Sequence, residues 1–199
     1  MFKVSLLSLI SYLIGSIPSG YIIARIWRGI DIRKCGSGNI GFTNILRVIG
    51  PVPGLVTLFL DVFKGLFVAC LVKRFIGEPS EVMMLLPAIS VVIGHNYSLF
   101  LSFQGGRGVA TGLGIILGFS LPVAGIGFLV WLTVVIIFRY VSLGSIVTVA
   151  SLPLLVFLLK KPPFLFYLSI LLAVFIIIKH IPNIRRLIAG RENRMKFKR

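Results

Sequence analysis

The chain has 199 residues, of which 57% are hydrophobic, and a mean hydropathy of +1.05. This composition excludes a soluble globular domain, because the apolar runs approach the ~20 residues that a helix needs to cross a bilayer. A net charge of +16 would favour nucleic-acid binding in a soluble protein, but here most basic residues flank apolar runs, so we expect membrane lipids and no nucleic acid as partners.

The apolar runs predict an all-α, polytopic membrane protein with about seven transmembrane helices, forming a single integral-membrane domain over residues 1–199. We expect these helices near 4–24, 52–72, 82–95, 108–121, 122–138, 143–159 and 163–181. The first run is long for a signal peptide and lacks a small-residue cleavage site, so we interpret it as a retained helix. The segment 108–121 is short for a ~30 Å hydrocarbon core, which leaves full and partial crossing open. If the chain forms a hairpin at Pro122, the later loops stay on the same sides of the membrane whether this segment crosses fully or only in part.

Basic residues predict the orientation. The loop after the first helix is rich in arginine, and the C-terminal tail carries Arg185, Arg186, Arg191, Arg194, Lys196, Lys198 and Arg199. The positive-inside rule places both in the cytoplasm, with the N-terminus outside. The basic residues left outside are partly offset by Glu78 and Glu81. Cys35 and Cys70 are then expected on opposite sides, without a disulfide, and neither has the spacing of a metal site.

The first polar cluster, CGSGNIGFTNILR, runs from Cys35 to Arg47. Its glycines, Gly38 among them, let consecutive backbone N–H groups face an anion. Short polar side chains are added by Ser37, Asn39, Thr43 and Asn44. Arg47 would supply a full positive charge in a fork that matches phosphate oxygens. The alternative is a plain polar loop between two helices.

The second polar cluster, GHNYSLFLSFQGGRGVATG, spans Gly94–Gly112. Its glycine turn comes directly before a helical run, and the N-terminus of a helix is suited to binding phosphate. The candidate residues of this turn and helix start are Gly105, Gly106, Arg107, Gly108 and Thr111. The spacing is not that of a P-loop, and a plain re-entrant turn is the alternative. His95 opens the cluster, either as a capping or packing residue or as a contact to substrate.

Two further clusters and one charged pair complete the polar inventory. Ser142 and Ser145 lie just inside a helix start, where hydroxyls cap N–H groups or meet a ligand. His180 and Asn183 are three residues apart and face the same pocket if helical geometry persists there. Asp61 and Lys64 lie inside the second apolar run, and we interpret them as a structural ion pair, with direct catalysis as the alternative.

All four polar clusters fall on the predicted cytoplasmic face, which favours one shared anion-binding site. The sequence contains no Ser-His-Asp order, HxxxxD box, HExxH motif or paired acidic residues. It is therefore equipped to bind negative charge rather than to supply a strong base. A transporter for a small phosphorylated solute is the competing class, since such proteins also contain intramembrane charges and glycine-broken helices. Against it, no second polar set lies on the outer face to permit alternating access.

The segments SGNIGFTNILR, LDVFKG, GHNYSLFLSFQGGRGVATG, YVSLGS and HIPNIRRLIAGRE together resemble, in order, the bacterial acyl-phosphate:glycerol-3-phosphate acyltransferase family (PlsY). The resemblance implies a multi-pass enzyme of the bacterial inner membrane with a cytoplasmic active site and no metal or cofactor. Its reaction would transfer a fatty acyl group from acyl-phosphate to the 1-hydroxyl of sn-glycerol 3-phosphate. The products would be lysophosphatidic acid and phosphate, in the first acylation step of phospholipid synthesis. We expect it to act as a monomer.

The resemblance also implies roles for single residues. The residues that hold phosphate groups, and are therefore the catalytic candidates, would be Ser37, Arg47, Arg107, His180 and Asn183. The further substrate-binding candidates are Gly38, Asn39, Thr43, Asn44, His95, Gly105, Gly106, Gly108, Thr111, Ser142 and Ser145. Arg107 stands where the family's GGKG motif has lysine, and Phe42 stands where GATN has alanine. We hypothesise that a substrate phosphate oxygen accepts the proton, with His180 as the rival base.

Overall fold

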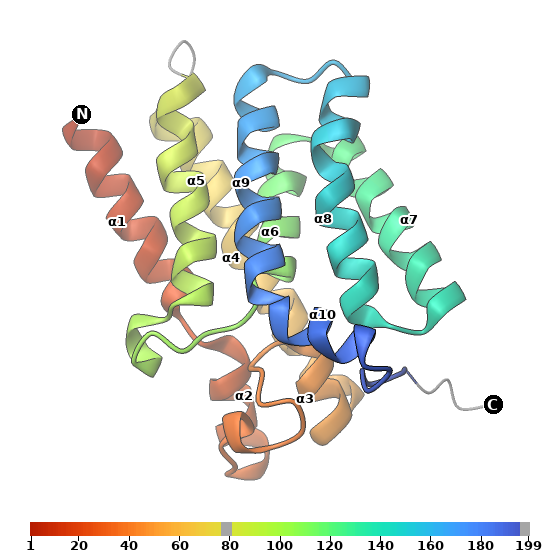
Figure 1. Ribbon diagram of the computed structural model, residues 1–199. Helices are drawn as coiled ribbons and strands as arrows, with labels where there is room; N and C mark the ends of the chain where they lie inside the picture. Colours follow the sequence, from red (N-terminus) through yellow and green to blue (C-terminus); the bar gives the residue numbers. More distant parts are fainter. Residues whose placement is uncertain (77–80, 196–199) are drawn as a thin grey trace. The chain divides into compact units, whose positions relative to one another are not determined.

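The computed structural model describes residues 1–76 and 81–195, and all regular elements of this part of the chain are helical (Figure 1). They are α1 (Phe2–Ser16), α2 (Ser19–Arg28), η1 (Ile32–Lys34), α3 (Phe42–Val48), α4 (Pro51–Phe75), α5 (Glu81–Asn96), η2 (Leu99–Leu101), α6 (Val109–Phe119), α7 (Leu121–Phe138), α8 (Val141–Leu158), α9 (Pro163–Lys179) and α10 (Ile181–Ile188). Glu78, Lys196, Lys198 and Arg199, which the charge argument used, lie outside the described residues, as does the side chain of Glu81. The all-α prediction is confirmed.

The helices form two compact units, residues 1–119 and 120–199. In the first unit, α1 packs along α5 and α4 packs along α6, while α2 and α3 contact α4 (Figure 1). Glycines permit the closest of these approaches. A Cβ at Gly15 would collide with the carbonyl oxygen of Val91, and one at Gly94 with that of Tyr12. The α1–α5 pair is therefore in backbone contact, as small residues allow between membrane helices.

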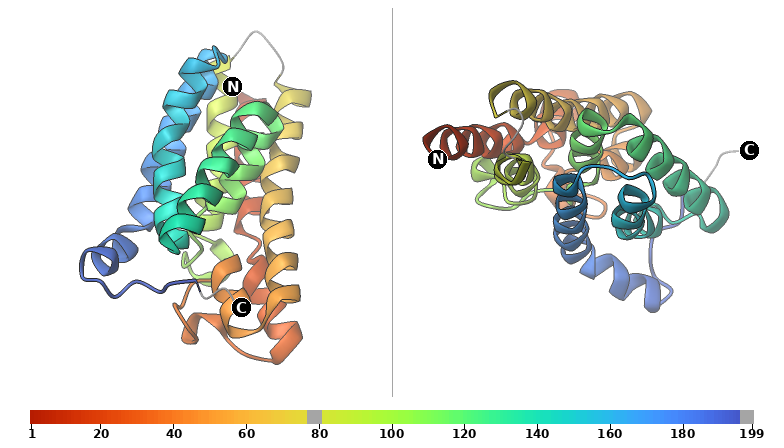
Figure 2. Two further views of the ribbon diagram at one scale, coloured as in Figure 1. Left: turned by 90° about the vertical axis from the view of Figure 1, so that its right-hand side faces the viewer. Right: turned by 90° about the horizontal axis from the view of Figure 1, so that it is seen from above.

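The second unit is built from helices that follow one another in the chain. Figure 2 shows α7, α8 and α9 lying side by side, with α8 in contact with both of the others. The chain bends by 59° between α9 and α10. His180 occupies this bend, and Pro182 lies in the first turn of α10, where its missing N–H costs no helical bond.

Five helical segments of the described chain are long and apolar enough to cross a membrane: Phe2–Arg28, Pro51–Phe75, Met83–Leu101, Leu121–Phe138 and Val141–Leu158. The bent pair α9–α10 raises this number to six, and α6 is a shorter apolar helix. Their outer surfaces are apolar; along α4, for example, Phe59, Phe63 and Phe67 are exposed and stacked ring on ring. These features define an integral membrane protein. The seven crossings and the orientation of the termini remain predictions.

The structure differs from the predicted helices at two places. The first helix, predicted as 4–24, breaks into α1 and α2, because Pro18 has no N–H and cannot continue the helical hydrogen bonds. A short helix, α3, also lies within the predicted polar loop. The predicted break near Pro122 is present: α6 ends at Phe119, and the Ser120 hydroxyl accepts a hydrogen bond from the Val123 N–H at 3.5 Å at the start of α7.

Candidate active site

The first polar cluster folds around the buried side-chain amide of Asn44. Its oxygen accepts a hydrogen bond from the Ser37 N–H at 2.9 Å, and its nitrogen donates to the carbonyl oxygens of Cys35 and Asn39 at 3.0 and 2.8 Å. Gly36 and Gly38 have positive φ angles of 59° and 73°, which L side chains rarely adopt. One asparagine thus holds together a turn of about ten residues.

The side chains predicted to meet phosphate lie on the accessible part of this loop. Ser37, Asn39 and Thr43 are half-buried, and Arg47, in the last turn of α3, is exposed. The hydrogen bond from the Arg33 guanidinium, at 2.7 Å, lowers the pKa of the Asp31 carboxyl to about 2. This pair offsets its own charge, and Arg47 supplies an exposed cation within the Cys35–Arg47 cluster.

The second polar cluster turns back on the end of α5. The Gly106 N–H donates to the His95 carbonyl oxygen at 2.9 Å. A Cβ at Gly105 would collide with that same oxygen, and one at Gly108, where φ is +84°, would lie 2.7 Å from the Asn96 side-chain oxygen. The turn therefore requires glycine on both sides of Arg107, and it leads directly into α6.

Polar groups are buried at this turn without a partner among the described residues. They are both side-chain atoms of Asn96 and the hydroxyl of Thr111, and both residues are fully buried. Buried polar atoms are rarely left unpaired in native proteins. The first turn of α6 also presents backbone N–H groups that have no acceptor within the helix. These groups fit a bound anion or the water that accompanies it.

The first and second clusters lie together within the first unit. Ile40 and Ile45 of the first cluster pack with Ile32 of η1, Leu101 of η2 and Ala24 of α2 in one buried apolar core. The two clusters thus share a buried apolar core through Leu101, four residues before the turn 105–108. Within the first unit, apolar side chains of the two clusters are therefore in contact, and the shared anion-binding site stays a prediction.

His95 is placed in a buried charged cluster with Asp61 and Lys64. The Lys64 ammonium lies 2.9 Å from an Asp61 carboxylate oxygen and 2.7 Å from the His95 Nδ1 atom. All three residues are at most 5% exposed. The ion pair expected from the sequence is present, but its histidine partner was not foreseen, because 31 positions separate Lys64 from His95.

In the second unit, the third and fourth clusters meet at Glu192. One carboxylate oxygen accepts hydrogen bonds from the Ser142 hydroxyl at 2.9 Å and the Asn183 amide at 2.7 Å, and the other accepts from Arg186 at 2.7 Å. Burial raises the pKa of Glu192, but the hydrogen bonds from Arg186, Asn183 and Ser142 outweigh it and hold the pKa below its ordinary value. Glu192 is the last residue of the HIPNIRRLIAGRE segment, and the sequence pattern alone did not predict this central position for it.

The remaining predicted residues of the second unit are buried. The His180 Nδ1 atom lies 2.8 Å from the Ile176 carbonyl oxygen. Since a carbonyl only accepts a hydrogen bond, Nδ1 carries a proton, and in a neutral ring Nε2 would then be the acceptor nitrogen. The Ser145 hydroxyl donates to the Val141 carbonyl oxygen at 2.9 Å. The side-chain oxygen of Asn183 is buried and has no hydrogen-bond partner in the described part of the chain.

The described chain contains no group of three His, Cys, Asp or Glu residues placed to hold a metal ion. Its polar segments instead combine arginines, glycine turns and amides on a set of apolar helices. This combination defines a class, namely membrane-embedded proteins that bind anionic small molecules or lipid headgroups.

Comparison with known proteins gives the family. A family model described as glycerol-3-phosphate acyltransferase matches residues 5–190. A glycerol-3-phosphate acyltransferase of Desulforamulus reducens is 48% identical over 182 residues, covering 92% of this chain and 90% of that protein. A second, of Moorella thermoacetica, is 46% identical over 187 residues and covers 94% of both chains. The chain therefore belongs to the glycerol-3-phosphate acyltransferase family.

Solved structures agree with this assignment. The crystal structure of PlsY, an integral membrane glycerol 3-phosphate acyltransferase, in its glycerol 3-phosphate form has a TM-score of 0.92 and 39% identity, covering 97% of this chain and 96% of that one. The lysophosphatidic acid form of PlsY has a TM-score of 0.90 and 38% identity. This protein is thus a membrane acyltransferase acting on glycerol 3-phosphate, and the solute-carrier alternative loses its support.

Proposed function

We propose that the protein transfers a fatty acyl group from acyl-phosphate to the 1-hydroxyl of sn-glycerol 3-phosphate. The products are lysophosphatidic acid and inorganic phosphate, in the first acylation step of bacterial phospholipid synthesis. The reaction takes place at the cytoplasmic face of the inner membrane. It needs no metal or other cofactor, and a single copy of the chain suffices.

The observation that carries this proposal is the pairing of the first two polar clusters in the first unit. Ile40 and Ile45 of the first cluster pack with Leu101 of the second cluster, and unpartnered buried amide and hydroxyl groups lie beside the turn with Arg107. Two arginine-bearing segments of this kind suit a reaction in which both reactants carry phosphate. The neighbouring crystal structures, in glycerol 3-phosphate and lysophosphatidic acid forms, support the same acceptor and product.

The proposed roles follow from the donors that each residue offers. Ser37, Arg47 and Arg107 in the first unit bind phosphate oxygens, helped by the backbone N–H groups of the glycine turns. In the second unit, His180 does the same from Nε2 when its ring is protonated, and Asn183 does so with the amide N–H that is not used by Glu192. Asn44 shapes its loop, since both ends of its amide are bonded to that loop. Charge neutralisation by these groups makes the departing phosphate a good leaving group.

In the proposed step, the hydroxyl oxygen of glycerol 3-phosphate forms the ester bond to the acyl carbon, and the bond from that carbon to the phosphate oxygen breaks. The hydroxyl proton passes to a phosphate oxygen of the substrate, so the protein mainly positions the reactants. His180 is the alternative acceptor. Complete loss of turnover in His180→Ala, with substrate binding intact, would reject the substrate-assisted route.

The donor is tested with purified protein, glycerol 3-phosphate and either acyl-phosphate or acyl-CoA. We expect lysophosphatidic acid and an equal amount of inorganic phosphate from acyl-phosphate, and little product from acyl-CoA. Product from acyl-CoA alone would overturn the proposed donor. Product from neither would overturn the proposed reaction.

A further inference from the structure

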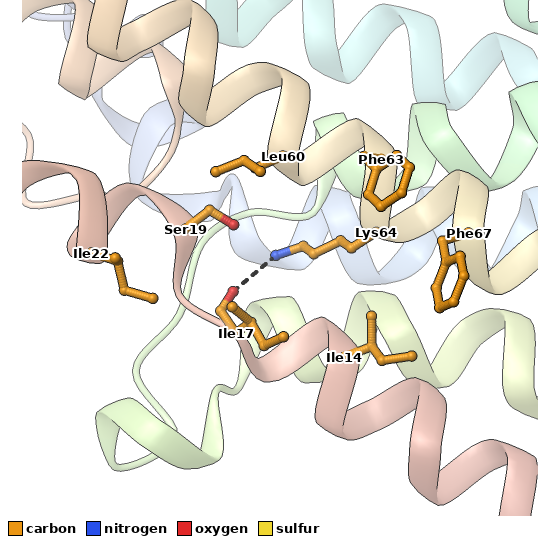
Figure 3. A pocket seen from close by; sticks show the side chains of 8 residues that line it. All are labelled: Ile14, Ile17, Ser19, Ile22, Leu60, Phe63, Lys64 and Phe67. Carbon is orange, nitrogen blue, oxygen red and sulfur yellow. Dashed lines mark hydrogen bonds between the residues drawn. The ribbon is translucent and has the colours of Figure 1, made fainter.

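Lys64 is a buried ammonium group in the first unit that the proposed reaction does not use. Its side chain is 6% exposed and that of its partner Asp61 is 3% exposed. Beside it lies an open surface pocket of about 320 Å³ between α4 and the α1–α2 segment, lined mainly by apolar side chains such as Ile14, Phe63 and Phe67 (Figure 3). Because the Lys64 side chain is buried, its N–H groups depend on acceptors within the protein.

The first acceptors are at the break between α1 and α2. In an unbroken helix the Ser19 N–H would donate to the Gly15 carbonyl oxygen, four residues earlier, but here it donates to the Ile17 carbonyl oxygen at 3.0 Å. Lys64 replaces the missing donor, because its ammonium lies 3.2 Å from the Gly15 oxygen. It also lies 3.3 Å from the Ile17 oxygen, the contact drawn as a dashed line in Figure 3. It therefore caps the end of α1.

The next acceptor is His95. An ammonium group donates but cannot accept, so the 2.7 Å contact makes the His95 Nδ1 atom the acceptor and leaves the ring proton on Nε2. That Nε2 edge faces Gly106, since a Cβ at Gly106 would collide with it. The His95 carbonyl oxygen meanwhile accepts from the Gly106 N–H at 2.9 Å. His95 thus holds the glycine turn with both its ring and its backbone.

Helix α4 supports the same turn on the other side. A Cβ at Gly65, the neighbour of Lys64, would collide with the Thr111 carbonyl oxygen in the first turns of α6. The residue pair 64–65 is therefore placed between the end of α1, the end of α5 and the start of α6.

We propose that Asp61, Lys64 and His95 form a positioning cluster that fixes the Gly105–Gly108 turn, and with it Arg107, in the geometry that binds phosphate. This inference rests on the proposed phosphate-binding role of Arg107. The three residues are positioning residues, because they act through the turn and not on the substrate. Asp61 forms an ion pair with the Lys64 ammonium, and Lys64 donates a hydrogen bond that orients the His95 imidazole. The imidazole in turn packs against Gly106 and fixes the position of the turn.

The test replaces the pair by neutral side chains of similar size, in Asp61→Asn/Lys64→Met, so that no single charge is left buried. His95→Leu removes the acceptor without touching the pair, and His95→Asn keeps an acceptor oxygen close to the position of Nδ1. We expect kcat/KM for glycerol 3-phosphate to fall by about 10- to 100-fold in the first two variants, as for misplacement of about 1 Å. His95→Asn should recover part of this loss. Lys73→Met, on the same helix but outside the cluster, should leave kcat/KM unchanged.

A double-mutant cycle with Arg107→Gln separates positioning from general destabilisation. If the cluster acts through Arg107, the cluster variants lower kcat/KM by less than about twofold in the Arg107→Gln background. A full additional loss in that background would overturn the positioning role and leave the role of Arg107 intact. Unchanged kinetics in Arg107→Gln alone would overturn the phosphate-binding role, and the positioning cluster with it.

Discussion

Individual polar side chains in this protein divide into those that hold the backbone and those that face outward. Asn44 shares its loop with Arg47, yet the asparagine is 1% exposed and bonded to the loop, whereas the arginine is exposed. The sequence pattern predicted that both belong to one polar segment. It did not separate the two roles, because the direction of a side chain in an irregular loop depends on the fold around it.

Arg47→Ala should weaken the use of glycerol 3-phosphate. Loss of a charge-assisted hydrogen bond costs about 1.5–3 kcal/mol, which corresponds to a fall in kcat/KM of roughly 10- to 150-fold. Steady-state kinetics with varied glycerol 3-phosphate would measure it. Arg28→Ala, an exposed arginine at the end of α2, is the control. Equal kinetics in Arg47→Ala and wild type would remove Arg47 from the site.

Glu192→Gln should make stability less dependent on acid pH. The pKa of Glu192 is lowered in the folded protein from its ordinary value of 4.5, so the charged carboxylate stabilises the fold above pH 4.5. That contribution disappears as the pH falls through the lowered pKa. We therefore expect wild type to be more stable than the variant near pH 7 and the difference to shrink below pH 4.5.

Thermal unfolding in detergent at several pH values between 7 and 3 would measure this difference. A constant difference over the whole range would show that the charge of Glu192 contributes nothing to stability. Ser142→Ala, which removes only one neutral donor to Glu192, is a matched variant whose effect should be smaller.

At the scale of helices, glycine positions decide how closely neighbours approach. A Cβ at Gly114 on α6 would collide with the Val62 carbonyl oxygen on α4, whereas one at Gly125 on α7 would meet nothing within 4 Å. We expect Gly114→Ala to destabilise the protein by about 1–3 kcal/mol through overpacking. Gly125→Ala should be neutral or stabilise by up to about 1 kcal/mol. Thermal unfolding of both variants measures the two changes in stability. An equal loss of stability in Gly114→Ala and Gly125→Ala would contradict close α4–α6 packing.

The helices themselves were largely predictable, because long apolar runs in a membrane protein are almost always helical. The break at Pro18 and the short helix α3 were not predicted. The ends of helices depend on contacts such as those from Lys64 to the Gly15 and Ile17 carbonyl oxygens, which join positions far apart in the chain. For the same reason, the sequence predicted which segments carry polar groups but not that His95 joins the Asp61–Lys64 pair.

At the scale of the whole molecule, the proposed orientation can be tested with the protein's own cysteines. Cys35 lies in the first polar loop, half-buried, and Cys70 is exposed on α4; both are free. In a Cys70→Ser variant, a membrane-impermeant maleimide should label Cys35 in inverted inner-membrane vesicles and not in intact spheroplasts. A Cys35→Ser/Cys70→Ser variant gives the background. Labelling in spheroplasts would place the loop outside and overturn the cytoplasmic site.

The pattern of helix partners also sets an order of assembly during translation. In the second unit each helix packs on the next one made, but in the first unit α1 pairs with α5 and α4 with α6. At about 5–20 residues per second, the nascent α4 enters the membrane seconds before α5 brings His95 to Lys64. During that interval Asp61 is the nearby ionic partner that already accompanies the ammonium. The i, i+3 spacing of this pair thus gives Lys64 a counter-charge on its own helix before His95 has been synthesised.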